Sequence, residues 1–152
     1  MFSAHVILFE RGDIWRRALR ICDAELGDEA PWRDVIETRS LAECRQELLA
    51  AHASVLGLEF TPRDAVGVVE LLVEIKQRTP LALAVVLVTP DNLPFAKWKL
   101  LQAGAKHVIT SRRRMGEFAV IARRHLTKMQ RLTVQADAEL PWEERIRAEL
   151  PL

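Results

Sequence analysis

The sequence predicts an α/β fold of three layers, in which helices cover both faces of a doubly wound parallel sheet of five strands. Five strand-like apolar runs alternate with five helix-like stretches, and the loops between them are short. This alternation indicates a parallel sheet, because parallel neighbours need a crossover connection that is usually a helix. The predicted strands are His5–Phe9, Asp34–Thr38, Ala53–Phe60, Leu81–Thr89 and His107–Thr110.

Local patterns support this arrangement of strands. The segment His5–Phe9 is a short continuous apolar run, as expected for a strand that is buried on both faces. The segment Asp34–Thr38 is more polar, which favours a position near an edge of the sheet. Because strand–helix–strand crossovers are right-handed, few topologies remain, and we expect the flavodoxin-like strand order 2-1-3-4-5.

Capping residues and apolar spacing predict the helices. Asp13 is expected to cap a first helix whose apolar residues recur at helical spacing as far as Leu26. Ser40 can cap the second helix, Leu41–Ala51, and Thr79-Pro80 should stop the third. The fourth and fifth helices are expected at Leu93–Ala103 and Met115–Met129.

The chain is expected to divide into a domain over residues 1–130 and a linker with a short amphipathic helical tail over residues 131–152. A tail helix is predicted from Leu140 to Leu150, because Pro141 suits the first position of a helix. Trp142, Ile146 and Leu150 fall on one stripe of that helix. A helix this short is not stable alone in water, so we expect its apolar stripe to dock on this chain or on a neighbour.

Composition narrows the function classes. The 152 residues carry 22 basic and 21 acidic side chains, so no global charge directs the protein toward nucleic acid or a membrane. No signal peptide and no membrane-spanning run is found, and we expect a cytoplasmic protein. Cys22 and Cys44 lie at apolar helix positions without metal-ligand spacing, so we expect buried thiols, no metal and no other cofactor.

Several short motifs stand where the predicted strands end. Glu10-Arg11 follows the first strand, Thr61-Pro62 follows the third, Thr89 ends the fourth, and Gly104-Ala105 precedes the fifth, which leads to Ser111. In their order and spacing these motifs resemble the receiver domain of bacterial response regulators, over about residues 4–129. The resemblance implies phosphoryl transfer to an aspartate at the end of the third strand. It also implies an acidic pair that holds Mg²⁺, a Ser or Thr after the fourth strand, and a Lys after the fifth.

The chain departs from that pattern at most of these positions. Counting back from Pro62 places Leu58 at the phosphoacceptor position, with Glu59 as the nearest acid. The acidic pair is Glu10-Arg11, and the lysine position holds Ser111, so that only Thr89 matches outright. We therefore expect a degenerate pseudo-receiver without catalysis. Our hypothesis is that Arg11 bonds Glu10 or Glu59 and takes over the electrostatic role of the metal, although Glu59 could instead be a solvated carboxylate.

A candidate interaction surface lies elsewhere. In receivers the fourth helix, fifth strand and fifth helix commonly pair with a partner, and here Trp98 and Lys99 belong to that region by resemblance. Trp98 could instead be part of the core, and the basic last helix could be a solvated face. The residues of this candidate surface are Trp98, Lys99, Arg112, Arg123, Arg124, Trp142, Ile146 and Leu150.

The leading functional prediction is a protein–protein interaction or scaffolding module in bacterial signal transduction that is not regulated by aspartyl phosphorylation. Its partner would be another protein or a second copy, and not a membrane. One alternative is a small-ligand-binding flavodoxin-like protein, although the sequence has no acid–base pair or phosphate-binding glycine loop. Another is a nucleic-acid-associated regulator that uses the basic last helix.

Overall fold

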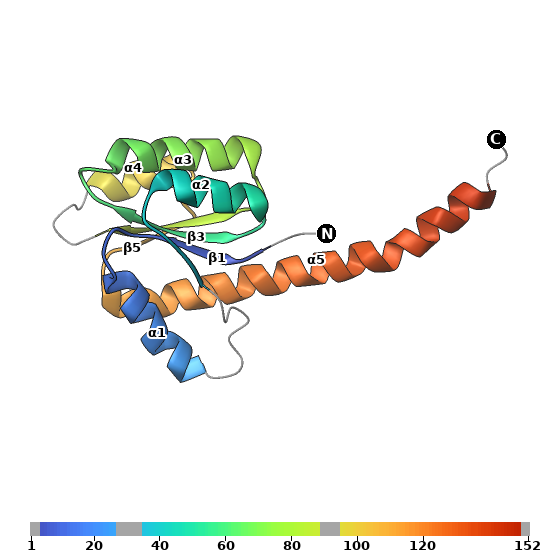
Figure 1. Ribbon diagram of the computed structural model, residues 1–152, viewed down its shortest axis with the longest axis horizontal. Coiled ribbons are helices and arrows are strands. Elements are labelled where there is room, and N and C mark those ends of the chain that lie inside the picture. Colours follow the sequence, from blue (N-terminus) through green and yellow to red (C-terminus); the bar gives the residue numbers. More distant parts are fainter. Residues whose placement is uncertain (1–3, 27–34, 89–94, 150–152) are drawn as a thin grey trace.

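Five parallel strands form one sheet in the order β2-β1-β3-β4-β5, which confirms the predicted topology (Figure 1). The computed structural model describes residues 4–26, 35–88 and 95–149. The polar strand β2 lies at an edge, as expected from its composition. The strands are β1 (Val6–Phe9), β2 (Val35–Thr38), β3 (Val55–Phe60), β4 (Leu83–Val88) and β5 (His107–Ile109).

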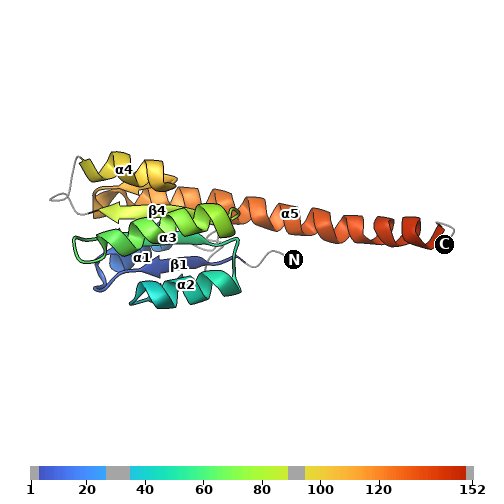
Figure 2. The same cartoon turned by 90° about the horizontal axis from the view of Figure 1, so that it is seen from above.

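Helices cover both faces of the sheet, so the molecule has three layers (Figures 1 and 2). Two long helices, α1 (Ile14–Leu26) and α5 (Met115–Glu149), pack against each other on one face. The opposite face carries α2 (Leu41–Ala50), α3 (Ala65–Arg78) and α4 (Phe95–Ala103). A short 3-10 helix, η3 (Arg112–Arg114), joins β5 to α5.

The core is divided by the sheet into two apolar clusters. Ile7 and Phe9 of β1 point toward the α2–α3–α4 layer, whereas Val6 and Leu8 point toward α1 and α5. This alternation follows from the two-residue period of a strand, and it makes β1 apolar at every position because both of its faces are covered. All four of these side chains are at most 1% exposed, and burying each contributes about 1.5–3 kcal/mol.

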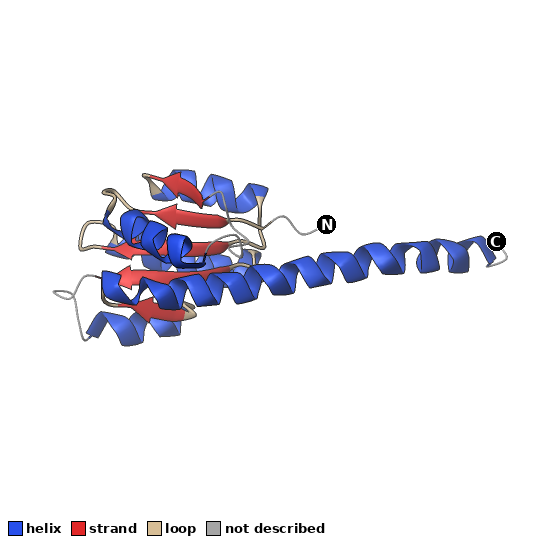
Figure 3. Cartoon of the chain, turned by 90° about the horizontal axis from the view of Figure 1, so that it is seen from below, coloured by secondary structure: helices blue, strands red, loops and turns tan. Residues whose placement is uncertain are grey.

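The C-terminal part of the chain differs from the prediction. The structure has one continuous helix from Met115 to Glu149 and no break near residue 130 (Figure 3). The sequence between Gln130 and Glu139 contains no Gly or Pro and several good helix formers, so nothing stops the helix there. Pro141 lies inside the helix, where it lacks the N–H that would bond the fourth carbonyl before it. Trp142 and Ile146 lie on this part of α5, and Leu150 lies outside the described residues.

Candidate functional site

The candidate site is the edge of the sheet where the parallel strands end, which we call the rim. Strand register brings two of its parts together: Phe9 of β1 is paired with Leu58 of β3, and Glu59 is paired with Leu87 of β4. Glu10, which follows Phe9, therefore lies beside the end of β3. Thr89, the residue expected to match the receiver pattern, lies outside the described residues.

Glu10 is buried and caps the helix that follows it. Glu10 is only 2% exposed, and its two carboxylate oxygens accept hydrogen bonds from the backbone amides of Trp15 (3.2 Å) and Arg16 (2.7 Å). These amides are among those that the first turn of α1 leaves without partners. Burial raises the pKa of Glu10, and the two amide hydrogen bonds oppose part of that rise. The prediction that Asp13 caps this helix is corrected, because the Asp13 carboxylate instead pairs with Arg17 at 2.7 Å.

Arg11 forms an ion pair that the sequence analysis assigned to the wrong partner. Its guanidinium donates to both carboxylate oxygens of Asp64, from Nε at 2.8 Å and from the second nitrogen at 2.9 Å. The hypothesis that Arg11 bonds Glu10 or Glu59 is therefore wrong for the side chain. Only the Arg11 amide reaches Glu59, at 3.4 Å. Arg11 lowers the pKa of Asp64 by hydrogen bonding and by its charge, and the bond to Asp64 raises the pKa of Arg11.

No motif in the sequence singled out Asp64, which follows Thr61-Pro62 in the turn before α3. Its side chain is 8% exposed, and it also lies 3.5 Å from the Thr61 hydroxyl. The available signal was a lone acid four residues after the end of β3, at the same sheet edge as the unexpected Arg11. A cation that replaces an expected acid needs a counter-charge, and Asp64 supplies it.

Arg39 holds the loop that follows β1. Its guanidinium donates to the carbonyl of Glu10 at 3.2 Å and also to the carbonyl of Gly12. Arg39 comes directly after β2, and β2 is paired with β1, so its side chain is placed to reach this loop. The sequence analysis did not identify Arg39. Hydrogen bonds of Glu10, Arg11 and Arg39 thus connect the loop after β1 to α1, to the turn before α3 and to the end of β2.

Leu58 occupies the interior of the sheet. It is fully buried and belongs to the apolar cluster that also contains Phe9 and Val88. A leucine has no oxygen that could accept a phosphoryl group. Within residues 4–26, 35–88 and 95–149, no group of three His, Cys, Asp or Glu side chains could hold a metal ion.

Ser111 serves as a local cap where the resemblance placed a lysine. Its hydroxyl accepts a hydrogen bond from the Arg113 amide at 3.3 Å, at the start of η3. Nearby, Glu117 pairs with Arg114 at 3.0 Å and with the His107 ring at 2.8 Å. These contacts, with the charge of Arg114, lower the pKa of Glu117. The fifth-strand end therefore presents exposed arginines and no lysine directed to the rim.

The candidate interaction residues Trp98, Lys99, Arg112, Arg123 and Arg124 lie on three elements: α4, η3 and α5. Trp98 is 68% exposed on α4, so it is not a core residue, and Lys99 beside it is exposed as well. Arg112, Arg123 and Arg124 are exposed on η3 and α5. Helix α4 lies on one face of the sheet and α5 lies on the other, with β5 between them. These residues therefore border one edge of the sheet without forming a single cluster. No described helix has the length and apolar character needed to cross a membrane.

Comparison with known proteins identifies the fold. No protein-family model matches the chain, and no curated protein matches its sequence. In structure it is similar to a CheY-like protein (tadZ) from Pseudomonas aeruginosa PAO1, with a TM-score of 0.61 and 19% identity over 81% of this chain and 98% of that chain. It is similar to the BeF3-activated DrrB receiver domain, with a TM-score of 0.61 and 17% identity over 84% of this chain and 99% of that chain.

A third similar structure is the Mn(2+)-bound response regulator Rcp1, with a TM-score of 0.52 and 18% identity over 78% of this chain and 89% of that chain. At these identities the likeness concerns the fold alone. The chain therefore has the fold of a CheY-like receiver domain.

Proposed function

We propose that this protein is a receiver-fold module that acts by protein–protein interaction or scaffolding in bacterial signal transduction, without control by aspartyl phosphorylation and without catalysis. The observation that carries the proposal is the Arg11–Asp64 ion pair above a buried Leu58. A guanidinium stands where the resemblance requires a second metal-binding acid, and a hydrocarbon stands where it requires a nucleophile.

The charges of the rim argue against phosphoryl transfer. A divalent ion such as Mg²⁺ needs carboxylate oxygens that are free to bind it, and phosphoryl transfer needs that ion to offset developing negative charge. The Glu10 oxygens are engaged by the Trp15 and Arg16 amides, and the Asp64 oxygens are engaged by Arg11. The positive charge of Arg11 also opposes the approach of a cation.

The exposed side chains support binding to another protein. Trp98 presents a large apolar surface between Lys97 and Lys99, and tryptophan is common among the residues that dominate protein interfaces. The alternatives have less support. A flavodoxin-like ligand site at the strand ends would need free polar groups at the rim, whereas the Glu10 and Asp64 oxygens there already accept hydrogen bonds from within the chain.

Mass spectrometry tests the proposal directly. The protein is incubated with acetyl phosphate and Mg²⁺ beside a receiver that is known to accept phosphate, which serves as the positive control. We expect an unchanged intact mass for this chain and an increment of one phosphoryl group for the control. A stable phosphoryl adduct, removed when the modified residue is substituted, would overturn the proposal.

A capture experiment tests the interaction role. Tagged wild-type protein and the Trp98→Ser variant are exposed to extract from the source cells under the same conditions. We expect a defined partner with the wild type and a strong loss with the variant. A coloured preparation would favour the ligand-binding alternative, and a salt-dependent gel shift would favour nucleic-acid binding.

A further inference from the structure

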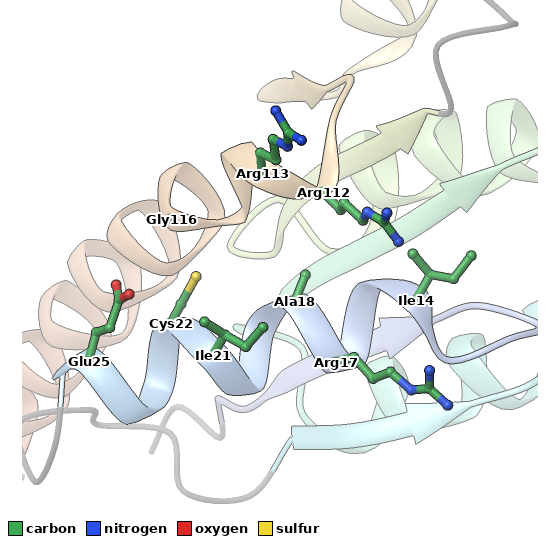
Figure 4. A pocket seen from close by; sticks show the side chains of 9 residues that line it. All are labelled: Ile14, Arg17, Ala18, Ile21, Cys22, Glu25, Arg112, Arg113 and Gly116. Atoms are coloured by element: carbon green, nitrogen blue, oxygen red, sulfur yellow. The ribbon is translucent and has the colours of Figure 1, made fainter.

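An apolar groove with basic residues at one end lies between α1 and the start of α5. Its volume is about 440 Å³, and its lining includes Ile14, Ala18, Ile21 and Cys22 of α1 and Gly116 of α5. Figure 4 shows these α1 side chains along the groove, with Arg112 and Arg113 at its η3 end. Ile14 and Ile21 are 50% and 65% exposed, so this face of α1 has apolar surface available for contact.

The cations at the groove are available as well. Arg112 and Arg113 are exposed, and within the described ranges neither forms an ion pair. Arg17, which also lines the groove, has its charge partly offset by Asp13. A Cβ added at Gly116 would meet nothing within 4 Å, so another backbone could approach α5 closely at this point. Glu25 also lines the groove, at the end of α1 away from η3, so it is the η3 end that suits an apolar helix face carrying negative charge.

The α5 helix itself has that kind of segment at its other end. From Arg112 to Arg131 the sequence contains seven basic residues and one acidic residue, whereas from Leu132 to Glu149 it contains five acidic and two basic residues. The acidic half also contains Leu140, Trp142 and Ile146. This distribution opposes the helix dipole, which favours acids near the N-terminus and bases near the C-terminus. The stability of the single helix thus does not explain the pattern.

The outer half of α5 projects away from the domain, as Figures 1 to 3 show. Among the α5 side chains whose burial is described, which end at Gln135, the last buried one is Met129, and Val134 is 67% exposed. The twenty residues from Gln130 to Glu149 make about 30 Å of helix. Because most helical stability in proteins comes from tertiary packing of an apolar face, this extension favours a packing partner. Because α5 is continuous, its own far end cannot fold back to the groove.

We propose that a second copy of this chain fills the groove, through an antiparallel pairing of the two α5 helices about a twofold axis near Leu132. Leu132 is the midpoint of the 35-residue helix, so in such a pair each acidic end lies beside the basic start of the other helix. The two contacts are identical by symmetry, as in most homodimers. The inference rests on the proposed interaction role and adds a second surface to it, separate from Trp98, that another copy of the chain occupies.

Charge-swap variants test the pairing in the full-length chain. One variant, Arg112→Glu/Arg113→Glu, makes the groove acidic, and the other, Glu144→Arg/Glu149→Arg, makes the helix end basic. Each homodimer would then place like charges together at both contacts. An equimolar mixture restores both contacts, because the acidic groove of one chain meets the basic end of the other and the basic groove meets the acidic end.

Sedimentation equilibrium measures the dimer dissociation constant for each protein and for the mixture. We expect a wild-type dimer that weakens when salt is raised from about 0.05 to about 0.5 M, which shortens the screening length. Each variant alone should dimerise at least tenfold more weakly, and the mixture should return to within about threefold of the wild type, where tenfold corresponds to about 1.4 kcal/mol. The control Lys76→Glu/Lys106→Glu, with the same charge change on exposed residues away from the groove, should behave as the wild type.

Three results would overturn the pairing: a monomer at all concentrations, a dimer that neither variant weakens, or a mixture no stronger than its parts. A monomer that needs Arg112 and Arg113 to bind a different protein would likewise overturn it and assign the groove to that protein. The proposed function fails on a separate measurement, the phosphoryl adduct. A monomer that acquires no adduct would overturn the pairing alone.

Discussion

Glu10 and Asp64 are acids at the same rim of the sheet, yet their pKa values are shifted in opposite directions. Burial raises the pKa of Glu10, whereas the Arg11 guanidinium lowers the pKa of Asp64. The two shifts give opposite dependences of stability on pH, because one group binds protons more readily in the folded state and the other less readily.

Replacing Asp64 by Asn should destabilise the protein most at neutral pH. The ionised Asp64 stabilises the folded state above its unfolded pKa of about 3.9, and that contribution is lost as the pH falls through the lowered folded pKa. Urea unfolding of wild type and Asp64→Asn from neutral to acidic pH measures the difference, which should shrink on acidification. Asp13→Asn, which breaks an exposed pair with Arg17, is the control and should have a small effect throughout. A difference for Asp64→Asn that grows on acidification would contradict the assignment.

Replacing Glu10 by Gln should give the opposite trend. Because the folded pKa of Glu10 is raised, its protonated form contributes stability below the unfolded pKa of about 4.3, and this is lost as the pH rises through the folded value. The stability of the wild type relative to Glu10→Gln should therefore fall with increasing pH in the same urea titration. Glu10→Ala removes both acceptors for the α1 amides and should cost about 1–2 kcal/mol. Parallel pH trends for the Glu10 and Asp64 variants would refute this account.

Replacing Gly57 by Ala should destabilise the fold because the sheet has no room for a side chain there. An added Cβ would lie 2.8 Å from Leu8 Cδ1 and 3.2 Å from Phe118 Cε2. Overpacking of this kind costs about 1–3 kcal/mol. Gly12→Ala is the control, since an added Cβ there meets nothing within 4 Å and should leave the stability nearly unchanged. Thermal unfolding should show a lower midpoint for Gly57→Ala alone, and a stabilised Gly57→Ala protein would show that β3 can move.

Two tryptophans should separate folding from binding. Trp98→Ala should change the unfolding free energy by no more than about 0.5 kcal/mol, because the residue is 68% exposed, but it should reduce partner capture. Trp15→Ala should cost about 3–5 kcal/mol, because Trp15 is 3% exposed and packs between α1 and the sheet. Chemical denaturation and the capture assay should be run together. Full capture by the Trp98→Ala protein would remove α4 from the candidate surface.

The arrangement of strands was predictable because it depends on local pattern. Continuous apolar runs such as Val6–Phe9 identify strands buried on both faces, and the polar Val35–Thr38 identifies an edge. Strand ends were placed to within a few residues, and right-handed crossovers restricted the sheet order to a few topologies, one of which is the observed order. The assignment of Leu58 to the phosphoacceptor position stays a prediction, since it depends on the resemblance and on counting back from Pro62.

Pairings between distant side chains were not predictable in the same way. Arg11 could reach several acids near the rim, and its choice of Asp64 depends on the path of the turn after β3. Arg39 depends likewise on where β2 ends beside β1. The extent of α5 was missed because Pro141 favours the first position of a helix, yet the helix formers on both sides of it continue the helix through this residue. The exposure of Trp98 depends on how α4 is rotated on the sheet.

The loop after β1 is held on both sides, by Arg39 from β2 and by Asp64 from the start of α3. If the proposed function holds, these contacts keep the loop in one conformation for binding partners, and phosphorylation does not change that conformation. The fraction of a partner that is bound then depends on the concentration of this protein, by mass action. Such a protein would convey information through its abundance, and cells would adjust its output by synthesis and turnover.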